Sequence, residues 1–483
     1  MDNVLKGLKP EAVFEYFEAL TRIPRESGNE ETVAVYLENF GKSLGFDVIR
    51  DAVNNVIITK PASAGYENAP VVILQGHTDM VCVKNDDLVF DFEKEPIPIV
   101  VDGDFIKTKG TTLGADNGIA VAMAMAILSS TELKHPRLTA LFTTSEETGM
   151  YGVMGLDPKD IKGDVLINLD SEEEGVLLAS CAGGVNNITE IETTLVKNEY
   201  DAAFRLVIQG LSGGHSGIEI GKNRANAIKL LGRTISIMKG HFDFTLFEVG
   251  GGEKMNAIAK RAEMKFVLRN RDVMLMEDLI PSIESTFKAE FEISDPGISL
   301  VLEEIDDPKE VFSAKDTKAI EMLLRLTPFG VQTMSAGIPG LVESSNNIGV
   351  LDEKDGKIKL TNAIRSSVRS LKEAMNEQMA LICEAVGGQN TLTSDYPEWS
   401  FKVDSPVREL MKTVYMDMYQ KELKVDAIHA GLECGFLKEK VGDIDMVSLG
   451  PNMYDVHTPH EHISISSTER VYTFLCEVLS RMK

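Results

Sequence analysis

The sequence contains little cysteine and no cysteine pair. Its five cysteines are dispersed, and no two form a C-x-x-C motif. An odd and scattered set argues against a disulfide framework and is typical of reduced thiols in the cytoplasm. The first residues also lack the basic start and the apolar core of a signal peptide. We therefore expect a cytoplasmic protein.

Long hydrophobic runs and an excess of positive charge are missing as well. No apolar run approaches the roughly 18–20 residues that a membrane-spanning helix needs. Lysine and arginine number 49 against 75 for aspartate and glutamate, so the formal net charge is −26. This charge argues against nucleic acid and anionic membranes as partners. The 43% hydrophobic content is that of a soluble globular protein, and a length of 483 residues favours two domains.

The order of apolar and polar segments predicts an α/β fold with an insertion. Buried strands are expected at 71–74, 138–142 and 165–169. Near residue 187 the pattern changes to half-exposed strands of alternating polarity, and the α/β pattern returns near residue 399. We predict a mostly parallel mixed sheet with helices on both faces, formed by residues 1–186 and 399–483. Residues 187–398 are predicted to form an inserted α+β domain.

Acids and histidine follow the ends of the three expected buried strands. His77-Thr78-Asp79 follows the first, the pair Glu146-Glu147 the second, and Asp170 the third. In an open α/β sheet, the functional crevice lies at the carboxyl ends of the strands. Histidine, aspartate and glutamate are also zinc ligands. The candidate ligands are His77, Asp116, Glu147, Asp170 and, from the C-terminal segment, His457.

The positions of these residues suggest different tasks. Asp116 stands at an expected helix start, where one carboxylate could bridge two cations that together clamp a hydrolytic step. Asp79 follows His77 by two residues and could orient its imidazole. Of the adjacent Glu146 and Glu147, one can bind metal while the other takes a proton from the attacking water. Each residue alone also has a structural explanation, such as a loop hydrogen bond, a helix N-cap or a solvated acid.

Six segments together resemble the co-catalytic zinc peptidases that include the aminoacylases. Within them the chain is similar to the aminoacyl-histidine dipeptidases, also called Xaa-His or cytosol non-specific dipeptidases. The segments run in family order over nearly the whole chain and are Gly76-His77-Thr78-Asp79, Thr112-Leu113-Gly114-Ala115-Asp116-Asn117-Gly118, Thr144-Ser145-Glu146-Glu147-Thr148-Gly149, Ile167-Asn168-Leu169-Asp170-Ser171, His429-Ala430-Gly431-Leu432-Glu433-Cys434-Gly435 and Val456-His457-Thr458-Pro459-His460-Glu461.

The resemblance implies a centre of two zinc ions, with Mn²⁺ or Co²⁺ as alternatives. His77, Asp116 and Asp170 would hold one ion. Asp116, Glu147 and His457 would hold the other, so that Asp116 bridges the pair.

The resemblance also implies how the residues around the metals act. Glu146 would be the general base, and Asp79 would orient His77. The peptide bond after the bridging aspartate is often cis in this family, and Asn117 stands here where the family often has a second aspartate. The family motif His-Ser-Pro-Asp-Glu reads His-Thr-Pro-His-Glu in this chain. We assign its first histidine as the ligand and place His460 and His462 at the surface or behind the ligands.

The inserted domain would be a lid that closes on a small peptide substrate, and relatives often form homodimers through it. His215 would polarise the scissile carbonyl or hold the developing oxyanion. Asn256 and Arg365 would hold the peptide backbone and its C-terminal carboxylate, for which an arginine fork is suited. Gly431 would line the pocket.

Three alternatives to a zinc dipeptidase are compatible with parts of the sequence. Ser212 lies in a G-x-S-x-G motif, but a nucleophile elbow should enter a helix at once, whereas residues 218–221 intervene. A non-catalytic peptide-binding protein should have lost the base or the ligands, and all are present. An N-acyl amino acid deacylase or a tripeptidase would keep the same chemistry on another substrate. The prediction is therefore a metal-dependent dipeptidase, with these two as the related options.

Overall fold

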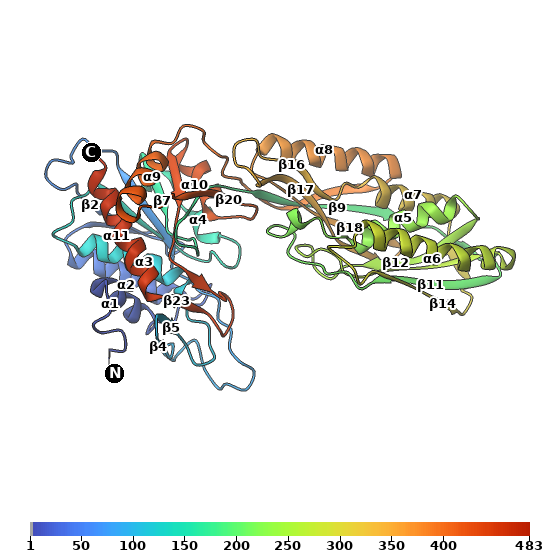
Figure 1. The fold of residues 1–483 in the computed structure, drawn as a ribbon, viewed down its shortest axis with the longest axis horizontal. Helices are drawn as coiled ribbons and strands as arrows, with labels where there is room; N and C mark the ends of the chain where they lie inside the picture. The colour runs from blue at the N-terminus through green and yellow to red at the C-terminus, as the bar shows by residue number, and fades with distance from the viewer. Residues whose placement is uncertain (1–2) are drawn as a thin grey trace. The chain divides into compact units, whose positions relative to one another are not determined.

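The computed structural model describes residues 3–483, and within it the chain forms two compact units. We call unit 1 the segment that ends at Ser180 together with Phe401–Ala427 and Leu432–Lys483. Unit 2 consists of Cys181–Ser400 and Ile428–Gly431. Figure 1 labels the elements of both units. None of the helices within the described range is long and apolar enough to cross a membrane.

Unit 1 is built around an eight-stranded mixed sheet. In spatial order its strands are β1 (Asp47–Arg50), β2 (Val56–Lys60), β6 (Leu138–Thr143), β3 (Val72–His77), β7 (Val165–Asn168), β21 (Asp445–Ser448), β8 (Val176–Cys181) and β20 (Lys424–Ile428). The four central strands β6, β3, β7 and β21 are parallel, whereas β1, β2 and β8 pair antiparallel at the margins. The predicted mixed α/β sheet and its three buried strands are confirmed, and the parallel pairing is confined to the centre.

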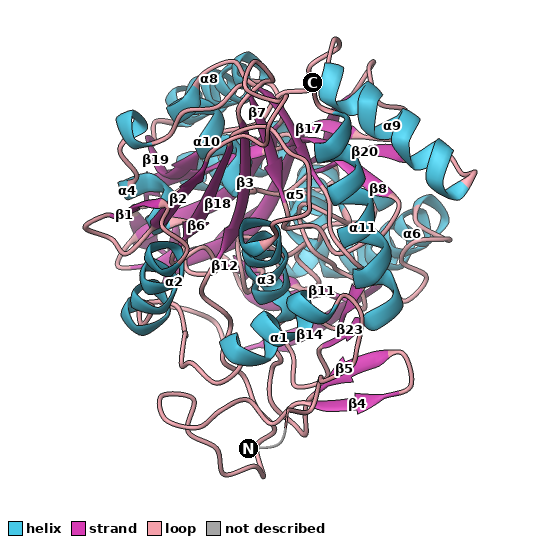
Figure 2. Cartoon of the chain, turned by 90° about the vertical axis from the view of Figure 1, so that its left-hand side faces the viewer, coloured by secondary structure: helices cyan, strands magenta, loops and turns pink. Residues whose placement is uncertain are grey.

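Seven α-helices of unit 1 accompany this sheet. They are α1 (Glu11–Leu20), α2 (Glu31–Ser43), α3 (Ala115–Ser129), α4 (Tyr151–Gly155), α9 (Pro406–Tyr419), α10 (Glu433–Val441) and α11 (Ile465–Arg481). Figure 2 shows α3 beside β3 and β6, and these elements are in contact. A small sheet is formed by β22 (Met453–Tyr454), β23 (His462–Ser464), β5 (Phe105–Lys107) and β4 (Val100–Asp102).

Unit 2 contains a nine-stranded sheet. Its main order is β14 (Ser299–Ile305), β11 (Ala202–Gln209), β13 (Ala262–Leu268), β12 (Phe244–Gly251), β17 (Val342–Lys354), β18 (Lys357–Ser366), β9 (Gly183–Glu192) and β19 (Gln389–Tyr396), and β16 (Gly330–Met334) also pairs with β17. Strands β10 (Leu195–Lys197) and β15 (Glu310–Phe312) form a separate pair. The α-helices are α5 (Ala227–Lys239), α6 (Val273–Glu290), α7 (Ala314–Leu326) and α8 (Arg369–Val386).

The β17–β18 hairpin is directed by its turn. Lys354 pairs with Lys357, so Asp355 and Gly356 form a two-residue loop. Both loop residues have positive φ, at 54° and 73°. This is the backbone that a type I′ hairpin turn requires, and Asp-Gly is a favoured sequence for it. The turn sets the register of the hairpin as far as Val350, and a shift of one residue between Ile348 and Val350 then places Arg365 opposite Ser345.

Helix α3 lies close to β3 because both have small residues at the contact. Every residue from Ala115 to Leu128 is buried, and the helix is rich in alanine. At Gly76 an added Cβ would lie 2.5 Å from Asn117 Oδ1 and 2.8 Å from the Cβ of Ala120. This close approach places the start of α3 against the end of β3.

Replacing Gly76 with alanine should therefore destabilise the protein. We expect a loss of about 1–3 kcal/mol, because an extra methyl group would overpack the contact between β3 and α3. Urea unfolding followed by circular dichroism would measure it. Gly250→Ala is the matched control, since its added Cβ would meet only Leu351 O at 3.7 Å. Equal stability of the two variants would contradict this account.

Candidate metal centre

The parallel register of unit 1 brings three of the predicted ligands, His77, Glu147 and Asp170, to one edge of the sheet. His77 at the end of β3 pairs with Thr143 at the end of β6, and Gln75 pairs with Asn168 at the end of β7. The chain leaves all three strands in the same direction. The segments that follow carry the acids, which explains why the ligands meet although they are far apart in the sequence.

Asp116 lies between the two histidines. Its Oδ1 is 3.2 Å from His77 Nε2, and its Oδ2 is 3.0 Å from His457 Nε2. Asp170 Oδ1 lies 3.5 Å from His77 Nε2, and Glu147 Oε1 lies 3.0 Å from His457 Nε2. The five predicted ligands thus form two groups that share Asp116, and in each group the ligand atoms lie within 4.8 Å of one another.

These side chains have the donor chemistry of a divalent cation site. Burial raises the pKa of Asp170 and of Glu147, although hydrogen bonds with histidine oppose the shift. Hydrogen bonds with Asp116 and Glu147 raise the pKa of His457 to about 11. The excess of negative charge therefore favours any positive charge placed between the carboxylates. Imidazole nitrogen and carboxylate oxygen are ligands for zinc, so the residues fit such an ion.

Asp79 lies behind His77 and also holds the turn that carries the glutamate pair. Its Oδ1 is 3.4 Å from His77 Nδ1. The same carboxylate accepts the backbone N–H groups of Glu146 and Glu147 at 3.1 and 3.2 Å and the Ser27 hydroxyl at 2.7 Å. Burial opposes its ionisation, but the interaction with His77, followed by the hydrogen bonds from Ser27 and the Glu146 N–H, outweighs burial and lowers the pKa of Asp79 to about 2. Asp79 thus links the imidazole to the turn.

Glu146 and Glu147 take different positions. Glu147 reaches His457, whereas Glu146 groups with His77 and Glu147 as possible ligands of one ion. Burial raises the pKa of Glu146 well above its usual value, and the carboxylates of Asp170 and Glu433 add to the shift while His77 opposes it. A raised pKa suits a carboxylate that must accept and return a proton.

The residue after Asp116 connects the ligands to the sheet. Asn117 Oδ1 accepts the His77 N–H at 3.2 Å, and its Nδ2 donates to Leu169 O at 3.1 Å. The Asp116–Asn117 peptide bond is cis. Asn117 therefore spans from the end of β3 to the segment that precedes Asp170.

The residues predicted to bind substrate belong to unit 2, where one row of the sheet carries several polar groups. Ser345 on β17 is opposite Arg365 on β18, which is opposite Gly184 on β9, which is opposite Tyr396 on β19. Because Gly184 has no side chain, the Tyr396 hydroxyl can accept a hydrogen bond from Arg365 Nη1 at 2.7 Å. Ser345 Oγ lies 2.7 Å from the buried His429 Nε2.

His215 lies in a glycine-rich loop of the same unit. Its Nδ1 accepts the N–H groups of Gly217 and Ile218, both at 3.2 Å. The ring proton of the neutral imidazole is therefore on Nε2. Burial and the charge of Arg365 lower the pKa of His215. The Asn256 carbonyl accepts the Ser216 N–H at 2.9 Å, next to the bridge between residues 215 and 257.

Gly431 closes the short segment Ile428–Gly431, which belongs to unit 2 although its flanks belong to unit 1. Ala182 donates its N–H to the carbonyls of Ile428 and Ala430, both at 3.1 Å. This segment also carries His429.

Sequence reasoning assigned no task to Glu433, which is fully buried below the ligands. Its Oε2 accepts hydrogen bonds from Gln75 Nε2 at 2.6 Å and Thr143 Oγ1 at 2.7 Å. Gln75 Oε1 in turn accepts from Asn168 Nδ2 at 2.5 Å. Burial raises the pKa of Glu433 to about 7. Gln75, Thr143 and Asn168 are polar residues within otherwise apolar strands, and they are the sequence signal for this network.

The serine-hydrolase alternative gains no support from the site. Ser212 Oγ donates to the carbonyl of Ser294 at 2.8 Å, and its N–H donates to Asp295. The hydroxyl thus bonds to backbone rather than to a histidine that could activate it.

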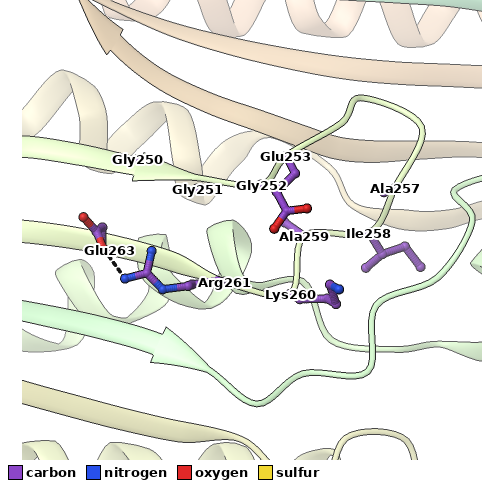
Figure 3. Close-up of a pocket in the computed structure, with 10 residues that line it drawn as sticks. All are labelled: Gly250, Gly251, Gly252, Glu253, Ala257, Ile258, Ala259, Lys260, Arg261 and Glu263. Atoms are coloured by element: carbon purple, nitrogen blue, oxygen red, sulfur yellow. Dashed lines mark hydrogen bonds and ion pairs between the residues drawn. The ribbon is translucent and has the colours of Figure 1, made fainter. Parts of the chain in front are cut away.

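Unit 2 also contains a cavity of about 230 Å³, whose lining residues are drawn in Figure 3. Its walls come from Gly250–Glu253, Ala257–Arg261 and Glu263. Arg261 Nη2 pairs with Glu263 at 2.5 Å. Within the described part of the chain, no residue predicted to bind substrate lines this cavity, so we do not assign it to the site.

Comparison with known proteins defines the class to which this site belongs. Residues 73–481 match peptidase family M20/M25/M40, and the chain belongs to this family. It is 36% identical, over 480 residues and 99% of both chains, to the cytosol non-specific dipeptidase of Escherichia coli (strain K12).

Solved structures agree with this assignment. The aminoacylhistidine dipeptidase from Vibrio alginolyticus matches with a TM-score of 0.96 and 35% identity, covering 99% of this chain and 98% of that one. A tripeptidase from Staphylococcus aureus shares the fold, with a TM-score of 0.56 and 15% identity over 98% of each chain. The protein is therefore a peptidase with the α/β fold that the sequence predicted.

Metal binding should release protons near neutral pH. Hydrogen bonds with Asp116 and Glu147 raise the pKa of His457 to about 11, and the pKa of His77 is raised well above its usual value, which favours the protonated form of both rings in the metal-free protein. A histidine must be neutral to bind a metal. The apparent affinity for Zn²⁺ should therefore rise with pH. Titration calorimetry in buffers of different ionisation enthalpy would measure the protons released, and a heat that is independent of the buffer would refute the prediction.

Proposed function

We propose that this protein is a cytoplasmic metal-dependent dipeptidase that hydrolyses short peptides, Xaa-His dipeptides among them. The observation that carries the proposal is the position of Asp116, whose two oxygens face His77 and His457 in two donor groups. The full-length similarity to two dipeptidases at 35–36% identity supports the substrate class.

The proposed cofactor is a pair of Zn²⁺ ions, with Mn²⁺ or Co²⁺ as alternatives. His77, Asp116 and Asp170 would hold one ion. Asp116, Glu147 and His457 would hold the other. When bound, such a pair supplies Lewis acidity and lowers the pKa of a coordinated water.

The proposed general base is Glu146. Its carboxylate takes a proton from the attacking water and returns it to the leaving amine. Its buried position and raised pKa support the role, because a carboxylate with a raised pKa accepts a proton more readily than an exposed glutamate does. Asp79 supports this role by holding the Glu146 N–H.

The inserted domain is proposed to bind the peptide and to form a homodimer. His215 would donate from Nε2 to the developing oxyanion, which fits the two N–H groups bound at its Nδ1. Arg365, oriented by Tyr396, would bind the C-terminal carboxylate. Asn256 and Gly431 would contact the peptide backbone.

Glu146→Gln should separate catalysis from metal binding. We expect kcat to fall by about 100- to 10,000-fold with the metal content unchanged, because the amide cannot accept the proton. Glu147→Gln is the matched variant next to it and should lose metal instead. Metal analysis and a dipeptide assay that includes β-Ala-His and ordinary Xaa-His substrates would check both. Near-normal turnover by Glu146→Gln would eliminate it as the base.

Removing the His215 imidazole should act mainly on kcat. The His215→Ala variant should lose about 100- to 1,000-fold, as expected for one oxyanion donor. Ser212→Ala is the control in the same loop and should keep its activity.

Running tripeptides and N-acyl amino acids in the same assay distinguishes the related substrates. The dipeptidase proposal fails if either of these is hydrolysed in preference to dipeptides.

A further inference from the structure

One buried carboxylate holds the loop that leads into Asp116. Glu461 is 2% exposed, and it accepts four consecutive backbone N–H groups. Its Oε2 accepts from Leu113 and Gly114 at 2.7 and 3.0 Å, and its Oε1 accepts from Ala115 and Asp116 at 2.8 and 3.3 Å. These N–H groups stand at the start of α3, where helix donors lack intrahelical partners and negative charge is favoured.

A buried arginine holds the carbonyl side of the same loop. Arg25, also 2% exposed, donates to Gly114 O and, from Nη1, to Thr78 O at 3.0 Å and Asp79 O at 3.1 Å. Burial lowers the pKa of Arg25, and Glu461 is the carboxylate that opposes this shift most strongly. Arg25 therefore links the loop before Asp116 to the turn that follows His77.

Two glycines leave space for this guanidinium. Gly114 has φ of +69°, and a Cβ there would collide with Arg25 Nη2. A Cβ on Gly118 would lie 2.6 Å from the same nitrogen. The glycines in this segment are thus explained by the approach of Arg25.

We propose that Glu461 and Arg25 are positioning residues that hold Asp116 between the two proposed metal positions. This inference rests on the proposed function. The hydrogen bonds of the Glu461 and Arg25 side chains described above are made with backbone groups of segments that carry a proposed ligand. Glu461 also follows His457 by four residues, so one segment both presents His457 and fixes the loop of Asp116.

Burying the charged side chains of Glu461 and Arg25 is unfavourable unless each charge is compensated. A further carboxylate close to Asp116 is repelled by it, and an unpaired buried charge is strongly unfavourable. Four N–H groups, the start of a helix and Arg25 compensate Glu461 together. The same contacts restrict the backbone of Asp116, whose side chain must face two histidines at once.

Glu461→Gln tests the proposal without a large change in shape. The new amide group would face two backbone N–H groups that need an acceptor. We expect the variant to bind Zn²⁺ about 10- to 100-fold more weakly in calorimetric titration of the metal-free full-length protein at 25 °C. With dipeptide substrate, kcat should fall while KM changes little. Circular dichroism would establish that the variant is folded.

Glu18→Gln is the matched control. Glu18 is also buried, and it accepts the backbone N–H groups of Val4 and Leu5 at 3.0 and 2.9 Å, away from the ligands. This variant should lose stability yet bind Zn²⁺ as the unmodified protein does. An equal loss of affinity in both variants would mean general destabilisation and would overturn the proposal.

Two milder variants keep the test decisive if Glu461→Gln does not fold. Glu461→Asp retains the carboxylate, and Arg25→Lys retains the charge but not the fork. Both should weaken Zn²⁺ binding. Unchanged affinity in a folded Glu461 variant would refute the positioning role. If the unmodified protein bound Zn²⁺ but cleaved no peptide, the proposed function would fail while the affinity test stood. If it bound no Zn²⁺, both proposals would fail.

Discussion

The structure at the sheet edge where β3, β6 and β7 end depends on the burial of several carboxylates within a few ångströms of one another. Asp116, Asp170, Glu146 and Glu147 surround two histidines, and burial together with the neighbouring carboxylates raises the pKa of Glu146, Glu147 and Asp170. Such a group is unfavourable unless positive charge lies among it. The raised pKa values of His77 and His457 favour protonated rings in the metal-free protein, and divalent cations would supply the positive charge in their place.

The remainder of unit 1 keeps this group in place. Parallel strands deliver the ligands to one edge, and the small residues of α3 let the start of that helix reach the end of β3. Asp79 joins His77 to the glutamate turn, while Asn117 joins it to the segment before Asp170. Glu461 and Arg25 add a second set of contacts on the backbone before Asp116. The ligands are thus held through their backbones as well as through their side chains.

In unit 2, the pairing of strands in the sheet determines which polar side chains lie next to one another. Its pairing register places Ser345, Arg365 and Tyr396 at one level on neighbouring strands, with Gly184 leaving space between two of them. This arrangement orients the guanidinium of Arg365 through the hydroxyl of Tyr396. It also brings His429 to Ser345 from a segment far along the chain. The result is a row of polar side chains in which the guanidinium of Arg365 has a fixed orientation.

The sequence by itself was enough to predict the α/β class and the three buried strands, and it named the His, Asp and Glu side chains that lie close together in two donor groups. These depend on local order: an apolar run makes a buried strand, and the residues that follow it must lie at the sheet edge. Only the tertiary structure decided which oxygen faces which histidine and which nitrogen of His215 carries the proton. It also gave Glu433, Glu461 and Arg25 their places, because each is defined by contacts with residues distant in the chain. A buried charge is tolerated only where folding supplies its partners, and no local pattern shows where those partners will be.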